Sequence, residues 1–310
     1  MSKYSRSLIL SMFLMSILIV SCQFNQDKTQ ISDKTTSKTI HPESNEDEDI
    51  TAVLEKILIA VGNKNAKELG DLATNNATIG LTYLQDGAWM NKELTIKEYL
   101  RKIVENKNPK PIAEIAEGFD IYVSEDRLAM VKAETFVSQF GVPKSREVNN
   151  LLMIKEKDDW KLQSIAWTVH PLPEEERKFN LNLFAHTYAQ VWGSKRPEFV
   201  AMFFEEGGAL QVNDGDPALG RNAISDVAQS FMTQFPDMNV SFDSLVHKTN
   251  GVEFHWTLTG TDADPNGKGH KVNINGYETW TMSEGNLIKD SKGHFSSDEY
   301  KRQLEFGSTN

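Results

Sequence analysis

Two strand-like runs near the C-terminus carry the side chains best suited to chemistry. In the first run, Ile274, Glu278 and Trp280 fall on one side, because a strand alternates its faces. In the second run, Asp290 and His294 share a side. A carboxylic acid among apolar groups has a raised pKa, which suits hydrogen-bond donation or acid/base chemistry. If the protein is an enzyme, we predict Glu278 as its acid/base, with Asp290 or His294 as the catalytic partner. The alternative for Glu278 is a buried acid held by a hydrogen-bond network.

Four aromatic residues accompany this acid and suit the lining of an apolar pocket. Tyr188 and Trp192 lie on a run with helical spacing, whereas Trp256 and Trp280 lie on strand-like runs. Small-molecule sites are lined mainly by apolar and aromatic side chains with a few polar groups. We therefore predict that these four residues bind a ligand. Core packing is the alternative for Tyr188 and Trp192.

No pattern typical of a metal or cofactor site is found in the sequence. The seven histidines show neither HxH nor HExxH spacing. The run that begins at Asp262 starts like a calcium loop, but Asn273 stands where that loop needs glutamate. Glycine-rich phosphate loops and GxSxG elbows are absent from the sequence, and a single Cys excludes a disulfide framework. We predict no metal and no cofactor.

The charge balance limits the partners. The 310 residues include 33 Lys+Arg and 44 Asp+Glu, which gives a net charge of −11. Nucleic-acid binding depends on basic side chains that displace counterions from phosphates, so a nucleic-acid partner is not expected. A length of 310 residues suggests one large or two smaller domains.

The N-terminus has the features of an export signal. Lys3 and Arg6 precede an apolar run at 8–20, which is shorter than the span of about 20 residues that a transmembrane helix needs. The end of this run, Ile19-Val20-Ser21-Cys22, resembles a bacterial lipobox. The resemblance implies removal of residues 1–21, a diacylglyceryl group on Cys22, and a fatty acid such as palmitate on the new N-terminus. The alternative is an ordinary secretory signal followed by an incidental cysteine.

Residues 22–48 are almost entirely polar and are predicted to form a tether between the lipid and the folded part. The predicted location is the bacterial cell envelope, with the chain lipid-anchored to a membrane outside the cytoplasm.

After the tether, one pattern of elements occurs twice. Each copy contains a helix, a short helix, a strand, a third helix and then several strands with alternating apolar residues. Two prolines and five charged residues interrupt the periodicity at 170–178. We therefore predict one domain at 49–172 and a second at 173–310. A last short helix follows in the second copy, with Ser297 as its expected cap.

The second copy resembles the SnoaL-like polyketide cyclase branch of the nuclear transport factor 2-like superfamily. The similarity covers about 180–307 and depends on four runs, at 256–261, 276–280, 293–295 and 299–304. The first copy is similar only in element order and in Asp159-Trp160-Lys161. The resemblance implies an α+β fold of two cone-shaped domains, each with three helices packed on a curved, mostly antiparallel sheet. It also implies frequent homodimers and many unrelated activities.

Comparison with ketosteroid isomerase, a member of that superfamily, assigns expected roles to several residues. It puts Glu278 at the acid that binds the oxyanion, Tyr188 at the tyrosine that assists it, and His294 at an aromatic position of the pocket. The general base belongs near the end of the first strand, where Val212 and Asn213 stand. Neither side chain takes up a proton at neutral pH, so this reaction does not fit the sequence.

These patterns lead to one main hypothesis and two alternatives. The main hypothesis is a membrane-anchored lipoprotein that binds a small apolar or amphipathic molecule in the cone of its second domain. The first alternative is an enzyme of the cyclase, isomerase or hydrolase type that uses Glu278. The second is a non-catalytic interaction module that pairs through the convex faces of its sheets.

Overall fold

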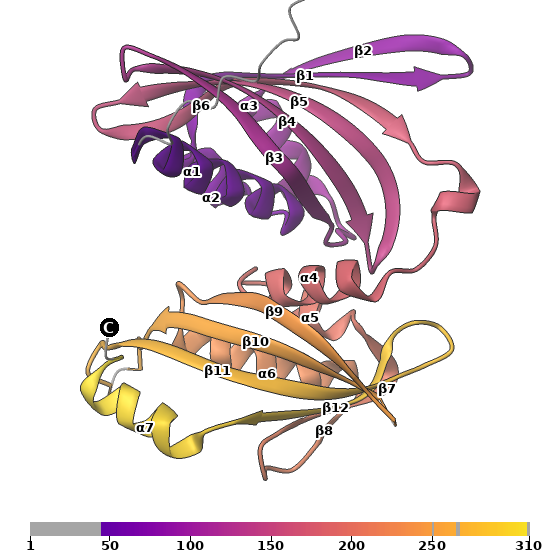
Figure 1. Ribbon diagram of the computed structural model, residues 1–310, viewed down its shortest axis with the longest axis vertical. Coiled ribbons are helices and arrows are strands. Elements are labelled where there is room, and N and C mark those ends of the chain that lie inside the picture. Colours follow the sequence, from indigo (N-terminus) through magenta and orange to yellow (C-terminus); the bar gives the residue numbers. More distant parts are fainter. Residues whose placement is uncertain (1–44, 250, 265–266, 309–310) are drawn as a thin grey trace, which may run out of the picture. The chain divides into compact units, whose positions relative to one another are not determined.

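The computed structural model describes residues 45–249, 251–264 and 267–308 of the chain (Figure 1). These residues form two six-stranded sheets with their helices, which confirms the predicted α+β class. The predicted signal sequence, Cys22 and most of the tether lie outside the described residues. In the part that is described, no helix combines the length and the apolar character that a membrane crossing requires.

The first half contains three helices and six strands. In chain order they are α1 (Asn45–Gly62), α2 (Ala66–Asp71), β1 (Ala73–Gln85), β2 (Ala88–Thr95), α3 (Ile96–Glu105), β3 (Ala113–Ser124), β4 (Leu128–Gln139), β5 (Val142–Glu156) and β6 (Asp159–Pro171). The strands follow one another across the sheet as β2-β1-β6-β5-β4-β3. Strands β1 and β6 are parallel, and the other neighbouring pairs are antiparallel. The strands curve around α1, α2 and α3 (Figure 1).

A short 3₁₀ turn, η1 (Glu174–Glu176), leads to the second half. The elements there are α4 (Leu181–Trp192), α5 (Pro197–Ala201), β7 (Phe204–Val212), β8 (Ala218–Leu219), α6 (Gly220–Gln234), β9 (Asn239–Lys248), β10 (Gly251–Thr261), β11 (Lys271–Met282), β12 (Ile288–Phe295) and α7 (Ser297–Phe306). The strand order is β8-β7-β12-β11-β10-β9, with β7 and β12 parallel. Each strand therefore takes the place of its counterpart in the first sheet, and the two halves repeat one topology. The domain limits at 49, 172 and 173 stay predictions.

Local side-chain bonds explain where two helices of the first half begin. At α3, Thr95 accepts a hydrogen bond from the backbone of Glu98, whose side chain bonds back to Thr95, so both form a capping box. At α1, Glu46 accepts hydrogen bonds from Lys155 (2.8 Å) and from the indole of Trp160 (2.9 Å). This anchor ties the first turn to the sheet, so α1 begins at Asn45, inside the segment predicted as tether.

Three further details differ from the sequence-based expectation, and the first is the two-residue strand β8, which was not predicted. Strand β2 was not predicted; it forms a hairpin with β1 through Asp86 and Gly87, which both have positive φ (51° and 81°). The cap of α7 is Ser296 rather than Ser297, because the Ser296 hydroxyl accepts from the backbone of Glu299 (3.2 Å). Ser297 is already the first residue of the helix.

The two cores differ in composition. The first is mainly aliphatic, and its most deeply buried side chains include Ile50, Leu54, Ile57, Leu69, Met153 and Leu162. The second is rich in aromatic rings, with Phe184, Tyr188, Phe199, Phe203, Phe204, Phe235, Phe254 and Trp280 all fully buried. Large rings fill the second cone and leave little free volume inside it.

A few contacts connect the two halves. In α4, the Gln190 amide donates to the side-chain oxygen of Asn63 at the end of α1 (3.0 Å). Phe140 follows β4 and packs edge-to-face on Phe203 of the second core, with 5.1 Å between ring centroids.

Candidate functional site

Glu278 is buried in the second half, on the inner strand β11. Residues directly opposite each other in an antiparallel pair point to the same face, and Glu278 lies opposite Gly293 of β12. Two positions along, Trp280 lies opposite Ser291. Glu278 is 6% exposed and Trp280 is fully buried. The strand alternation therefore predicted correctly that Glu278 and Trp280 face the core together.

Three donors converge on one oxygen of Glu278. Its Oε2 accepts hydrogen bonds from the Ser291 hydroxyl (2.6 Å), the Trp280 indole (2.9 Å) and the Tyr188 hydroxyl (3.0 Å). The other oxygen, Oε1, has no hydrogen-bond partner among the described side chains. Because Oε2 is occupied three times as an acceptor, Oε1 is the oxygen left to carry a proton.

Burial dominates the titration of this group. Desolvation raises the pKa of Glu278 above its ordinary value, although the hydrogen bonds from Ser291, Trp280 and Tyr188 oppose the shift. Burial, and then the charge of Glu278, raise the pKa of Tyr188 well above its ordinary value. Both shifts favour a neutral network, in which a protonated Glu278 and an un-ionised Tyr188 share a hydrogen bond.

A narrow, partly open cavity reaches Glu278 from the surface. Its volume is about 60 Å³. The lining is Trp192, Leu210, Val212, Phe231, Val240, Phe254, Trp256, Leu258, Glu278, Gly293 and Phe295. Apart from Glu278, these side chains are apolar or aromatic. Among the residues that the structure describes, the buried indole N–H groups of Trp192 and Trp256 make no well-aligned hydrogen bond, although Trp192 lies close enough to the Tyr188 hydroxyl to lower the pKa of that group. A buried donor without a partner is costly, so two such groups beside one cavity suggest a missing acceptor.

The predicted ligand-binding residues divide into two pairs. Trp192 and Trp256 line the cavity. Tyr188 and Trp280 are fully buried beside Glu278, pack edge-to-face on each other (5.2 Å between ring centroids), and do not line it. Their observed role is to donate to Glu278, while ligand contact stays a prediction for all four.

Asp290 and His294 do not join Glu278. They lie opposite Thr281 and Tyr277, so they point to the other face of the sheet, and both are exposed. The expected pairing of either residue with Glu278 is therefore not found. The physical reason is the register between β11 and β12, which puts Ser291 rather than Asp290 on the face of Glu278. Ser291 is the polar partner that sequence reasoning missed.

Asn213 has a structural role at the end of β7. Its side-chain oxygen accepts from the backbone N–H of Phe295 (2.9 Å), and its amide donates to the Ser297 hydroxyl (3.0 Å). These bonds join the strand to the start of α7. The position where a general base is expected is thus occupied by a group that holds two elements together.

The first half has a larger internal cavity that the sequence did not suggest. Its volume is about 170 Å³, and two carboxyl groups, Glu114 of β3 and Glu147 of β5, line it with Lys64 and Tyr99. Sequence reasoning passed over these residues, because glutamates in strands are usually solvated. The available signal was a strand phase that puts Glu147 on the side of the buried Ser145 and Asn149.

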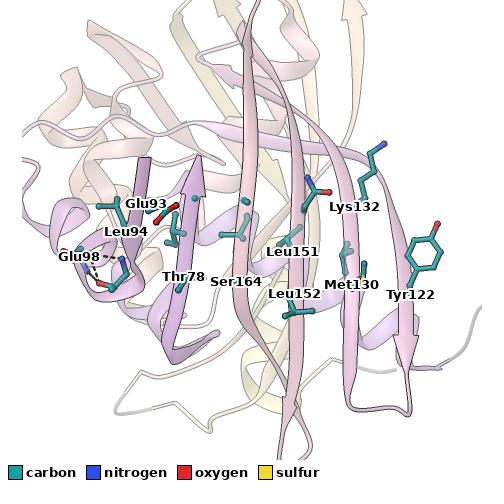
Figure 2. Close-up of a pocket in the computed structure, with 17 residues that line it drawn as sticks. Thr78, Glu93, Leu94, Glu98, Tyr122, Met130, Lys132, Leu151, Leu152 and Ser164 are labelled. Carbon is teal, nitrogen blue, oxygen red and sulfur yellow. Dashed lines mark hydrogen bonds between the residues drawn. The ribbon is translucent and has the colours of Figure 1, made fainter. Parts of the chain in front are cut away.

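A wide groove of about 870 Å³ crosses the face of the first sheet that the helices leave open. Figure 2 shows Tyr122, Met130 and Lys132 projecting from β3 and β4 along it. Tyr122 is 67% exposed and Met130 is 60% exposed. Glu98, at one end of the groove, is held by the cap of α3. The groove thus has the apolar character of a contact surface, without a cluster of titratable groups aimed at one point.

The fold and these cavities define a class of protein: a tandem of cone-shaped α+β domains with small internal pockets. The family model for the SnoaL-like domain matches residues 185–290, which lie in the second half. Among curated proteins, none is similar to this chain.

Solved structures with similar folds come from several proteins. One is described as a SnoaL-like polyketide cyclase from Jannaschia sp. CCS1, with 13% identity over 36% of this chain and 80% of that chain and a TM-score of 0.33. Another is an NTF-2-like protein of unknown function from Silicibacter pomeroyi DSS-3. The identity is 12% over 40% of this chain and 94% of that chain, and the TM-score is 0.30. A third is the epoxide hydrolase/cyclase-like enzyme SalBIII of salinomycin pyran ring formation. The identity is 17% over 36% of this chain and 87% of that chain, and the TM-score is 0.32. These similarities concern the fold alone.

Proposed function

We propose that this protein is a lipid-anchored binding protein of the bacterial cell envelope, and that its second domain takes one end of a small apolar or amphipathic molecule. The observation that carries the proposal is the lining of the second cavity. Its walls are apolar, and the polar groups at its surface are the indole donors of Trp192 and Trp256 and the carboxyl group of Glu278, whose pKa burial shifts toward the protonated form. A ligand that brings an acceptor oxygen would satisfy them.

The size of the cavity limits what it can take. A buried water molecule needs about 10–15 Å³ of cavity volume. The cavity of about 60 Å³ therefore accommodates roughly four non-hydrogen atoms. This suits an end group such as a methyl ketone or an ester carbonyl, with the rest of the molecule leaving through the opening. An aliphatic tail would continue along the apolar side chains of Phe231 and Phe295 at the lining.

Binding without catalysis fits the surroundings of Glu278 better than acid/base chemistry. General acid–base catalysis needs a group that exchanges protons within hydrogen-bond reach of the reacting atoms. Among the described residues, the partners of Glu278 are a serine, a tryptophan and a tyrosine whose pKa is raised. A fixed, neutral acid in such a network serves as a hydrogen-bond donor.

The lipid anchor is proposed from the sequence. It is supported by Lys3 and Arg6, the apolar run at 8–20 and Cys22, and more than one acyl chain provides stable attachment.

Pairing of two copies is a further part of the proposal. The exposed Tyr122 and Met130 of the outer groove in Figure 2 favour the first sheet as the contact face. The molar mass in solution, measured by light scattering, tests this pairing.

The ligand proposal is tested by NMR of the indole N–H signals, with 2-hexanone as the probe. We expect the signals of Trp192 and Trp256 to shift in a saturable way, because their N–H groups gain an acceptor. Trp89 is 57% exposed on β2 and is the internal control. Trp256→Phe keeps an aromatic ring but removes the donor, and we expect weaker binding. Saturating ketone that leaves the Trp192 and Trp256 signals unmoved, or moves Trp89 equally, contradicts the proposal.

A further inference from the structure

The cavity of the first domain is a partly open, mainly apolar space with charged groups in its lining. It lies between α1, α3 and the curved sheet and has a volume of about 170 Å³. Its apolar lining is Ile57, Val61, Leu69, Ile79, Ile96, Ile112, Val137, Leu162, Ile165 and Trp167. A cavity of about 150 Å³ lined by aliphatic side chains binds benzene, so this one has room for a molecule of that size.

One of the two carboxyl groups is built into the wall. Oε1 of Glu114 accepts hydrogen bonds from the Thr135 hydroxyl (3.0 Å) and the Asn149 amide (3.0 Å). The Asn149 amide also bonds to Thr135 (2.9 Å), and both residues are buried. The nearby Lys64 ammonium has a favourable charge interaction with Glu114. Burial nevertheless raises the pKa of Glu114, so Lys64 offsets the cost of that charge only in part and without a direct ion pair.

The second carboxyl group has less support. Glu147 accepts one hydrogen bond, from the Ser145 hydroxyl (3.1 Å) to Oε1. Its Oε2 has no partner among the described residues, and neither do the Tyr99 hydroxyl and the Lys64 ammonium. Polar atoms of α3, of β5 and of the turn after α1 therefore line the cavity without a hydrogen bond to the described residues.

The electrostatic balance shows which charge is missing. Burial and the charge of Glu114 raise the pKa of Glu147 to about 7. Burial and the charges of both glutamates raise the pKa of Tyr99 to about 12. Burial lowers the pKa of Lys64, although Glu114 opposes the shift. These are the charged and titratable groups at the cavity: two acids, one base and a neutral phenol. Glu147 is the carboxyl group without a nearby cation. Its repulsion from Glu114 disappears when it takes up a proton.

We propose that the first-domain cavity is a binding site for a small amphipathic amine, whose ammonium group lies against Glu147 and Tyr99 and whose apolar body fills the aliphatic wall. The ammonium supplies the missing positive charge and donates to the free oxygen of Glu147 and to the Tyr99 hydroxyl. Trp167 lines the same space and offers a ring face to the cation or the body. The site is separate from the cavity at Glu278, so it does not depend on the proposed function.

The proposal is tested by calorimetric titration of the full chain with three probes of one shape: benzylamine, benzyl alcohol and benzoate. We expect benzylamine to bind at least about tenfold more tightly than the alcohol, since a charge-assisted hydrogen bond to a buried carboxylate is lost in the alcohol. Binding should strengthen by about tenfold between about pH 6 and about pH 8, because Glu147 ionises in that range.

Two glutamine variants complete the test. Glu147→Gln keeps the side-chain shape, and we expect it to lose the preference for the amine and the pH dependence. Glu156→Gln, which makes the same change at an exposed position of the same strand, should behave like the original chain. Equal affinity for the amine and the alcohol, tighter binding of benzoate, or an unchanged preference in a folded Glu147→Gln each overturn the proposal. The pH dependence in the unsubstituted chain decides the matter if Glu147→Gln does not fold.

Discussion

Replacement of Glu278 by glutamine distinguishes a buried neutral acid from a buried carboxylate. The folded pKa of Glu278 lies above its ordinary value of 4.5, because burial disfavours the charged form. The folded chain therefore holds this proton more tightly than the unfolded chain does. Its stabilising effect is complete below 4.5 and is lost as the pH rises from 4.5 to the folded pKa. Glutamine does not titrate, so this dependence disappears in Glu278→Gln.

The expected change in stability of Glu278→Gln follows from the three hydrogen bonds to Oε2 and from the coupling between protonation and folding. The glutamine carbonyl can replace Oε2 as the acceptor for Ser291, Trp280 and Tyr188. Near pH 4 we expect the variant to be less stable by no more than about 1 kcal/mol, because its amide group replaces the protonated Oε1. Between pH 4.5 and the folded pKa of Glu278, the stability of the variant relative to the original chain should rise by about 1.4 kcal/mol per pH unit.

The assay is urea denaturation followed by circular dichroism, at steps from about pH 4 to about pH 8. At each pH, the free energy of unfolding of the original chain is subtracted from that of Glu278→Gln. The titration of other groups, such as Glu147, cancels in this difference. Glu284→Gln, at an exposed turn between β11 and β12, is the matched control and should give a flat difference. If the original chain instead gains stability over Glu278→Gln as the pH rises, Glu278 is an ionised carboxylate stabilised by its three donors. The neutral-donor argument is then wrong.

Three further predictions concern other parts of the chain. Cys22→Ala should release the protein from the membrane fraction, and a mature variant chain that stays bound after a high-salt wash would contradict the lipid anchor. Residues 177–310 should fold alone and melt cooperatively, because the buried members of the second core run from Phe184 to Ile288; a non-cooperative melt would mean a shared core. Glu46→Gln should destabilise the first domain, because the Lys155 hydrogen bond lowers the pKa of Glu46. That loss should be full above about pH 4.5 and fade as the pH falls further, while exposed Glu55→Gln in the same helix should have little effect.

The element order could be predicted because most elements carry a periodic apolar pattern. Strands β2 and β8 are the exceptions: seven of the eight residues of β2 are exposed, so it has no buried face, and β8 has only two residues. A strand without a buried face has no alternation to detect, and only the Asp86-Gly87 turn marked the hairpin. The early start of α1 was missed for a related reason. It depends on Lys155 and Trp160, which are more than 100 residues away in the sequence.

The candidate site could be predicted only in part. The alternation of β11 identified Glu278 as a core residue, since a phase within one strand is local information. Its partner on β12 depends on the register between strands, and a bulge next to Ile288 shifts that register. The bulge buries Ile288 while Asp290 faces outward, although both occupy positions of the same parity. Sequence parity alone therefore selected Asp290 and His294 over Ser291.

The two cones show how one topology acquires two chemical characters. In the second, Phe203, Phe254 and Trp280 fill the interior, and Glu278 accepts three hydrogen bonds on the same oxygen. About 60 Å³ remains, which leaves room for an end group that accepts hydrogen bonds. In the first, aliphatic side chains of smaller volume leave about 170 Å³, and the Lys64 ammonium interacts with Glu114 while the pKa of Glu147 rises to about 7. The half that contains the residues matched by the family model thus has the smaller cavity. Glu147, whose second oxygen has no partner among the described residues, lies in the first half, so a search for bound amines should begin there, and a search for ligands with acceptor oxygens should begin at Glu278.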